Sequence, residues 1–140
     1  MVLPGQSAVL ALQRAAHATV HALAAEVAAL SLTGSEISVL ANLADGRGRT
    51  MSELAAATGN RPTTLTSVLD RLERRGHITR GARPGDRRAV LIELTPSGRQ
   101  AATTILQAVT RLERRALAAL PAGTVSVLRT ALHALSEVSA

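Results

Sequence analysis

The chain has 140 residues, the size of one domain, and carries a formal net charge of +6 at pH 7. All 16 basic residues are arginine. Because a guanidinium group is a permanently charged fork that matches phosphate and guanine edges, this basicity favours a nucleic-acid partner. The absence of cysteine excludes disulfides and zinc–thiolate sites, and the absence of Phe, Tyr and Trp requires a core of aliphatic side chains.

The first predicted element is a long amphipathic helix over residues 9–30, where apolar residues recur at three- and four-residue steps. This segment does not read as a secretory signal, because it lacks a basic opening and is interrupted by Arg14, His17 and His21. No segment reaches the ~18 uninterrupted apolar residues that a membrane span requires. We therefore expect a cytoplasmic protein with no membrane partner.

Two capping boxes then predict the starts of two shorter helices. The first is Thr33–Glu36, which opens a helix that ends near Asp45 and Gly46. The second is Thr50–Glu53, which opens a short alanine-rich helix that stops at Gly59.

Pro62 is compatible with the first turn of the next helix, predicted to run to about Arg75. Residues 77–80 and 89–94 are predicted strands of a hairpin with a flexible loop between them. Thr95 and Pro96 open another long helix that runs to about Leu120, and a last helix covers residues 125–138. The predicted order is α-α-α-α-β-β-α-α.

This order predicts a mainly helical fold with a small β-hairpin wing. Residues 33–98 are expected to form a winged helix-turn-helix lobe within a single domain of residues 1–140. Residues 1–31 and 99–140 are expected to form dimerisation helices, since their apolar stripes exceed what the central lobe can cover. An intramolecular bundle is the alternative. The expected dimer contacts are Val9, Leu12, Val20, Leu112, Leu128, Leu132 and Leu135.

The second helix of the helix-turn-helix motif, which begins at Pro62, is expected to enter the major groove of double-stranded DNA. Arg61 could pair with guanine, threonine methyls could contact thymine methyls, and arginines further along could contact phosphates. The alternative is an ordinary solvated helix face. The residues expected to contact DNA from this helix are Arg61, Thr63, Thr64, Thr66, Ser67, Arg71 and Arg74.

The positive charge is concentrated between residues 70 and 88, which hold seven arginines and three acidic residues. The loop over residues 80–88 is expected to act as the wing, with Arg83 and Arg87 near its tip entering the minor groove. Asp86 is expected to hold a neighbouring arginine rather than to touch DNA. The wing residues assigned to the DNA-binding site are Arg80, Arg83, Asp86, Arg87 and Arg88.

Three segments resemble the MarR family of bacterial transcriptional regulators. They are Ser52–Ala55 (SELA), Arg61–Gly76 (RPTTLTSVLDRLERRG) and Gly85–Gly98 (GDRRAVLIELTPSG). The resemblance covers residues 32–98 by motif and the whole chain by helix order. The family's wing aspartate and arginine fall on Asp86 and Arg88.

The resemblance implies a homodimer that binds a short palindromic operator. It also implies a repressor released by a small-molecule effector in the cleft between the dimerisation helices and the DNA-binding lobe. The chain departs from many relatives in having Arg83 where they have an acidic residue. Without aromatic residues the cleft cannot stack against a flat phenolic effector, so a regulator that acts without a ligand remains an alternative.

Other functions have less support in the sequence. His17 and His21 have a spacing that can chelate a metal, and Glu26 could approach them, but no cysteine or adjacent acid completes a site. We therefore predict no metal and no cofactor, with zinc sensing as the alternative. No nucleophile elbow, phosphate-binding glycine loop or carboxylate pair indicates an enzyme. The two remaining alternatives are a winged helix that binds protein and an architectural DNA-binding protein without sequence preference.

Overall fold

The structure, a computed structural model, describes residues 1–83 and 85–139, with side chains for all of these except residues 83, 86–88 and 139. The chain forms two compact units, Met1–Val109 and Thr110–Ala140. As predicted, the fold is mainly helical with a small antiparallel sheet. Among the helices of the described ranges, none is both long enough and apolar enough to span a membrane.

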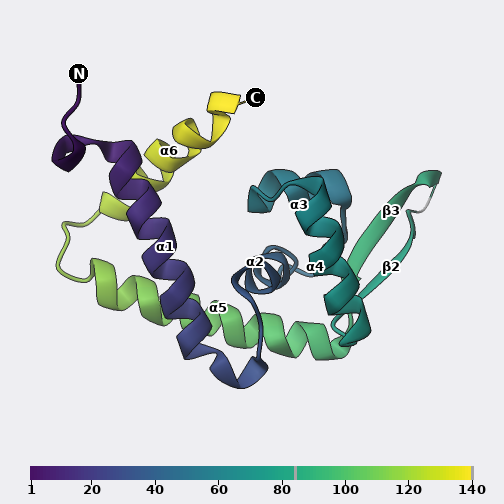
Figure 1. Cartoon of the computed structure of the whole chain (residues 1–140). Helices are drawn as coiled ribbons and strands as arrows, with labels where there is room; N and C mark the ends of the chain where they lie inside the picture. The colour runs from purple at the N-terminus through teal and green to yellow at the C-terminus, as the bar shows by residue number, and fades with distance from the viewer. Residues whose placement is uncertain (84, 140) are drawn as a thin grey trace. The chain divides into compact units, whose positions relative to one another are not determined.

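The first unit contains most of the secondary structure (Figure 1). Its helices and strands, in order, are α1 (Ala8–Glu26), α2 (Gly34–Asn42), β1 (Arg49–Thr50), α3 (Met51–Thr58), α4 (Pro62–Arg74), β2 (Ile78–Arg83) and β3 (Asp86–Leu94). Helix α5 (Pro96–Leu117) begins in the first unit and ends in the second, which also contains α6 (Thr124–Ser136). Short 3-10 turns cover Pro4–Gln6, Ala28–Leu30 and Glu137–Ser139.

The helix starts follow the capping signals in the sequence. The Thr33 hydroxyl accepts from the Glu36 amide at 3.2 Å, and the Glu36 carboxylate accepts from the Thr33 amide at 3.0 Å. The predicted capping box is therefore confirmed. The Thr50 and Thr95 hydroxyls likewise accept from amides three residues ahead, at 3.2 and 3.0 Å.

The sheet is larger than predicted, with three antiparallel strands in the order β1-β3-β2. The prediction that a flexible loop begins after residue 80 is wrong. Gly81 pairs with Leu91 and Ala82 with Val90, so both strands of the hairpin extend into the segment predicted as loop. Small residues have low strand propensity, which hid this extension. Strand β1 has only two residues and precedes a capping box, so it left no periodic pattern.

Several helix ends also differ from the prediction. Helix α2 ends at Asn42, before the expected end near Asp45 and Gly46. The first helix stops at Glu26, and the chain continues through Val27 (φ −108°, ψ 27°) into a 3-10 turn. Helix α5 ends at Leu117, three residues before the expected end.

The core lies in the first unit and is aliphatic. It joins α2, α3, α4 and the first half of α5 to the base of the sheet. Its fully buried members with the largest side chains are Leu40, Leu43, Leu54, Leu65, Leu69, Leu72, Ile78, Ile92, Ile105, Val39 and Val68. This packing fixes α4 and the hairpin on one frame, and Figure 1 shows the hairpin projecting beyond that frame.

Candidate nucleic-acid interface

The turn before α4 is built by a glycine and a proline. Gly59 ends α3 with φ +72°, a conformation that side chains disfavour. Arg61 is the N-cap of α4, and Pro62 occupies the first turn, where its missing N–H costs no hydrogen bond. One face of α4 is then fully buried by Leu65, Val68, Leu69 and Leu72, so the opposite face must point outward.

The outward face of α4 carries most of the residues that the sequence assigned to DNA. All but one of these are exposed, namely Arg61, Thr63, Thr64, Thr66, Ser67 and Arg74. The Thr66 hydroxyl donates to the Pro62 carbonyl at 2.9 Å, so its proton is already used within α4 while the side chain stays exposed. A row of hydroxyls and methyls between two arginines is suited to base edges and phosphates.

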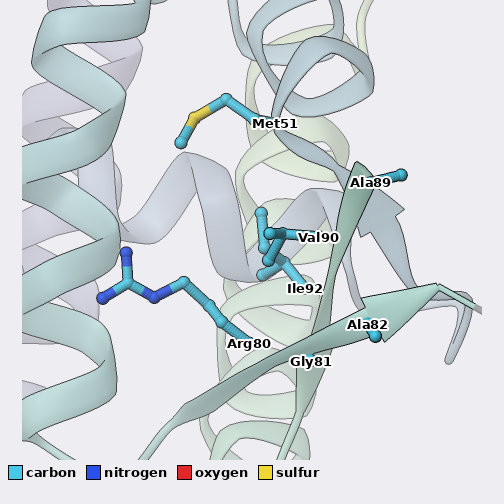
Figure 2. A pocket seen from close by; sticks show the side chains of 7 residues that line it. All are labelled: Met51, Arg80, Gly81, Ala82, Ala89, Val90 and Ile92. Carbon is cyan, nitrogen blue, oxygen red and sulfur yellow. The ribbon is translucent and has the colours of Figure 1, made fainter. Parts of the chain in front are cut away.

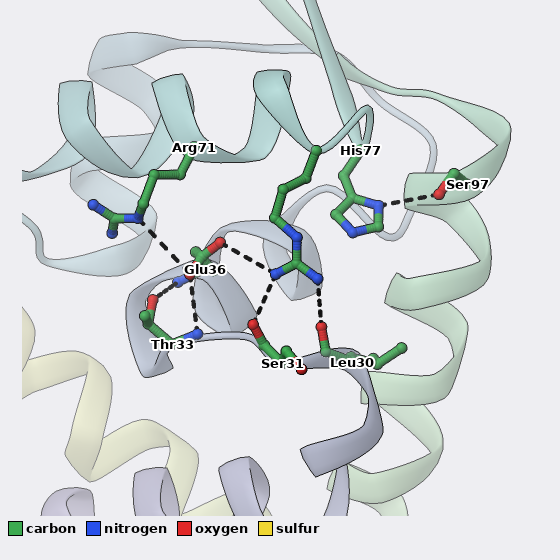
Figure 3. Close-up of polar contacts among 8 residues, drawn as sticks. Leu30, Ser31, Thr33, Glu36, Arg71, His77 and Ser97 are labelled. Atoms are coloured by element: carbon green, nitrogen blue, oxygen red, sulfur yellow. Dashed lines mark hydrogen bonds and ion pairs between the residues drawn. The ribbon is translucent and has the colours of Figure 1, made fainter.

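The C-terminal half of α4 is tied to the start of α2 (Figure 3). Glu36 is only 3% exposed, and its carboxylate lies 3.9 Å from Arg71 Nε and 3.8 Å from Arg75 Nη1. Arg75 also donates to the carbonyls of Ser31 and Leu30, at 2.8 and 2.6 Å. Arg71, which the sequence assigned to phosphate, is therefore partly engaged inside the protein.

The link through Glu36 was not anticipated from the sequence, although a signal for it exists. Glu36 precedes Leu40 by four residues and Leu43 by seven, so it lies on the buried face of α2. An acid on such a face needs a cationic partner, and the arginines of α4 supply it.

The wing residues fall into two groups. The side chains of Arg83, Asp86, Arg87 and Arg88 lie outside the described residues, so their assignment remains a prediction. Arg80 is described, and its Nη2 donates to Asp70 Oδ1 at 2.8 Å and Glu73 Oε1 at 2.7 Å. Its guanidinium is thus bound to two carboxylates of α4.

A groove of about 480 Å³ runs along the hairpin beside Arg80 (Figure 2). Its lining is mostly small or apolar: Met51, Arg80, Gly81, Ala82, Ala89, Val90 and Ile92. Small side chains allow another molecule to approach the backbone of the hairpin closely.

A second cavity, of about 200 Å³, lies within the first unit where α1, α2 and α5 meet. Its walls are largely aliphatic and carry no charged group. The lining residues are Val20, Leu23, Gly34, Ile37, Ser38, Ala41, Asn42, Ile105 and Val109. The cavity is lined by the same helix, α2, that carries Glu36.

The histidines on α1 lie close together, with ring centroids 4.4 Å apart for His17 and His21. Within the described part of the chain, no three His, Cys, Asp or Glu side chains are grouped to hold a metal ion.

The comparisons with known proteins agree with this architecture. Residues 30–89 match the model of the family described as "MarR family". A putative transcriptional regulatory protein for the hcr operon of Thauera aromatica is 36% identical over 72 residues, which are 51% of this chain and 43% of that protein. The chain spans about half of the length of the curated relatives it matches.

Solved structures match over nearly the whole chain. CouR from Rhodococcus jostii RHA1, bound to p-coumaroyl-CoA, is 25% identical with a TM-score of 0.86, over 97% of this chain and 96% of that one. A transcriptional repressor CouR bound to a 23-mer DNA duplex is 30% identical with a TM-score of 0.78, over 95% and 94% of the two chains. The family model matches residues 30–89 and these solved structures match over nearly the whole chain, and the chain belongs to the MarR family.

Proposed function

We propose that this chain is a sequence-specific DNA-binding transcriptional regulator that acts as a repressor. The observation that carries the proposal is the exposed row from Arg61 to Ser67 on α4, beside a hairpin rich in arginine. With α4 in the major groove, Arg61 would reach guanine edges and the threonines would reach thymine methyls. Arg74 would contact phosphate, and the wing arginines would enter the minor groove. The DNA-bound repressor among the similar structures supports this assignment.

The regulator would act as a homodimer on a palindromic operator. Helices α1 and α6, both within the described ranges, contain no buried residue, although both are rich in Leu, Val and Ala. Val9 and Val20 are each 48% exposed and Leu128 is 40% exposed, while Leu12, Leu112, Leu132 and Leu135 are partly exposed. A second copy would remove this apolar surface from water. Two copies of α4 would then read two half-sites one helical turn apart.

A small-molecule effector would bind in the cavity lined by α1, α2 and α5. A cavity of about 150 Å³ with an aliphatic and aromatic lining is known to accommodate benzene, so the 200 Å³ found here is large enough for a small ligand. A ligand in this cavity would contact α2, and α2 is connected to α4 through Glu36. The similarity to CouR, solved with p-coumaroyl-CoA, supports a ligand-responsive regulator.

The test is a binding titration against the DNA upstream of the chain's own gene, with random duplex as competitor, at two salt concentrations. A specific regulator should prefer one site by roughly 10³-fold or more and should lose affinity steeply as salt rises. Protein must be quantified by peptide absorbance, because the chain has no Trp or Tyr.

The same titration separates the two alternatives. Equal affinity for both duplexes would indicate an architectural protein. No affinity for either, repeated with duplexes from the whole surrounding locus, would indicate a protein-binding winged helix instead.

A further inference from the structure

Arg80 occupies an unusual place for a residue of a basic wing. It lies on β2, opposite Ile92 of β3, at the base of the hairpin rather than at its tip. Figure 2 shows its side chain reaching from the strand toward a neighbouring helix. It ends between Asp70 and Glu73, which are one helical turn apart on α4, and a single nitrogen donates to both carboxylates.

The charges of this cluster do not leave Arg80 available for DNA. One cation faces two carboxylates, so the cluster has a net charge of −1. The hydrogen bond from Arg80 lowers the pKa of Glu73, and the two carboxylates raise the pKa of Arg80, so Glu73 and Arg80 stay ionised near neutral pH. Arg80 is also more enclosed than its partners, with 26% of its side chain exposed against 49% for Asp70 and 43% for Glu73.

We propose that Arg80 is a positioning residue that fixes the wing hairpin to α4, and that it does not contact the DNA backbone. The proposal rests on the DNA-binding function proposed above. A hairpin attached only at its base can pivot relative to the helix beside it. Two charge-assisted hydrogen bonds to consecutive turns of α4 restrict that pivot, so α4 and the wing meet adjacent grooves together.

The proposal also explains two acidic residues on a helix that faces a polyanion. Asp70 and Glu73 repel phosphate, so on charge alone their removal should strengthen DNA binding. If these two carboxylates hold the wing in place through Arg80, their removal should instead weaken DNA binding. If Arg80 contacts DNA, removal of the two acidic residues should strengthen binding. If Arg80 positions the wing, the same removal should weaken binding.

The experiment measures the affinity of the full-length protein for its selected operator duplex across a series of salt concentrations. The variants are Arg80→Gln, Arg80→Lys, the double variant Asp70→Asn with Glu73→Gln, and Arg61→Gln as the matched arginine. Arg61 is exposed at the N-cap of α4 and makes no side-chain hydrogen bond to the helix end, so it is a suitable phosphate- or base-contacting control. Circular dichroism melting of each variant confirms that it is folded.

We expect Arg80→Gln to weaken binding about tenfold with an unchanged salt slope, because no counterion-releasing contact is lost. The double variant should weaken binding by a similar factor, and Arg80→Lys should restore most of the affinity. If Arg61 contacts phosphate, Arg61→Gln should lower the slope by about 0.9 for each subunit. Combining Arg80→Gln with the double variant should add little further loss, since all three residues act in one contact.

Two results would overturn the role of Arg80. One is a fall in salt slope for Arg80→Gln of the same size as one lost phosphate contact per subunit. The other is tighter binding by the double variant. A wild-type chain that prefers no duplex would overturn the proposed function itself. The wild-type titration gives this result before any variant is compared.

Discussion

Gly98 is a position where one missing methyl group decides how two elements meet. It lies in the first turn of α5, and a Cβ there would overlap the carbonyl oxygen of His77. We predict that Gly98→Ala lowers the free energy of unfolding by about 2–3 kcal/mol, because either α5 or the base of the hairpin must move. Urea denaturation followed by circular dichroism measures this loss.

Gly81→Ala is the matched control for that substitution. Gly81 lies in β2 without a positive φ, and no atom lies within 4 Å of the position that an alanine methyl group would take. Its free energy of unfolding should therefore change by less than about 0.5 kcal/mol. If both variants lost the same free energy of unfolding, the close contact of Gly98 with His77 would not be the reason for glycine at that position.

His77 also makes the stability of the contact between the base of the hairpin and the first turn of α5 depend on pH. Burial, and then the charge of Arg75, lowers the pKa of His77 below its usual 6.5, although Glu36 acts in the opposite sense. The unfolded chain therefore takes up the proton more readily than the folded chain. The contribution of His77 to stability is complete above pH 6.5 and is lost as the pH falls from 6.5 through the folded-state pKa.

The comparison that isolates this effect is with His77→Gln, whose amide can still face the Ser97 hydroxyl that lies 3.2 Å from His77 Nδ1. We expect the urea midpoint of the wild type, relative to the variant, to decline between about pH 8 and about pH 5. A constant difference across that range would mean that His77 has the same pKa in both states.

At the scale of the elements, Glu36 joins α2 to α4 and caps α2 as well. Glu36→Ala removes the acceptor for the Thr33 amide and leaves Arg71 and Arg75 without their shared carboxylate. Because both arginines keep partial access to water, we predict a loss of about 2 kcal/mol rather than the larger cost of a fully buried pair. Thermal or urea unfolding measures it.

Glu53→Ala is the matched substitution at the same helix position of α3. Glu53 is exposed, and its amide donates to Thr50 just as the amide of Glu36 donates to Thr33. It should cost about 0.5 kcal/mol, the contribution of a surface residue at a helix start. If the two variants lost equal stability, the link from Glu36 to α4 would contribute nothing.

Elements whose signals are local could be predicted from the sequence. The capping box at Thr33, the glycine end of α3 at Gly59 and the apolar stripe from Leu65 to Leu72 each depend on residues within one or two helical turns. These signals were enough to predict the helix-turn-helix and the outward row of α4. They also indicated the family.

Features that depend on distant residues could not be predicted in the same way. Arg80 meets Asp70 and Glu73 only because the hairpin folds back beside α4, and a run of arginines in sequence does not say which of them is already paired. Strand β1 similarly exists because β3 offers Leu91 and Ile92 as partners. Charge counted along the chain therefore overstates the charge available to DNA.

At the scale of the whole molecule, the exposed apolar residues of α1 and α6 predict the assembly. We expect the wild type to sediment as a species of twice the 14.5 kDa chain mass. Val9→Asp with Leu128→Asp should convert it to a monomer, because a carboxylate would be buried at each place in the interface. Val90→Asp is the control, since Val90 is 50% exposed on β3 and outside the proposed interface.

The monomer created by Val9→Asp with Leu128→Asp separates the contribution of dimerisation to DNA binding from that of α4 itself. In a dimer the second half-site is bound at a high effective concentration, so the monomer should lose about 10²–10⁴-fold in operator affinity. Its salt slope should fall to about half, because each subunit releases its own share of counterions. Its affinity for an isolated half-site should stay within about twofold of that of the wild type. Full operator affinity in a monomer would mean that one copy of α4 and its wing supply all the contacts, and the palindromic operator would then have no physical basis.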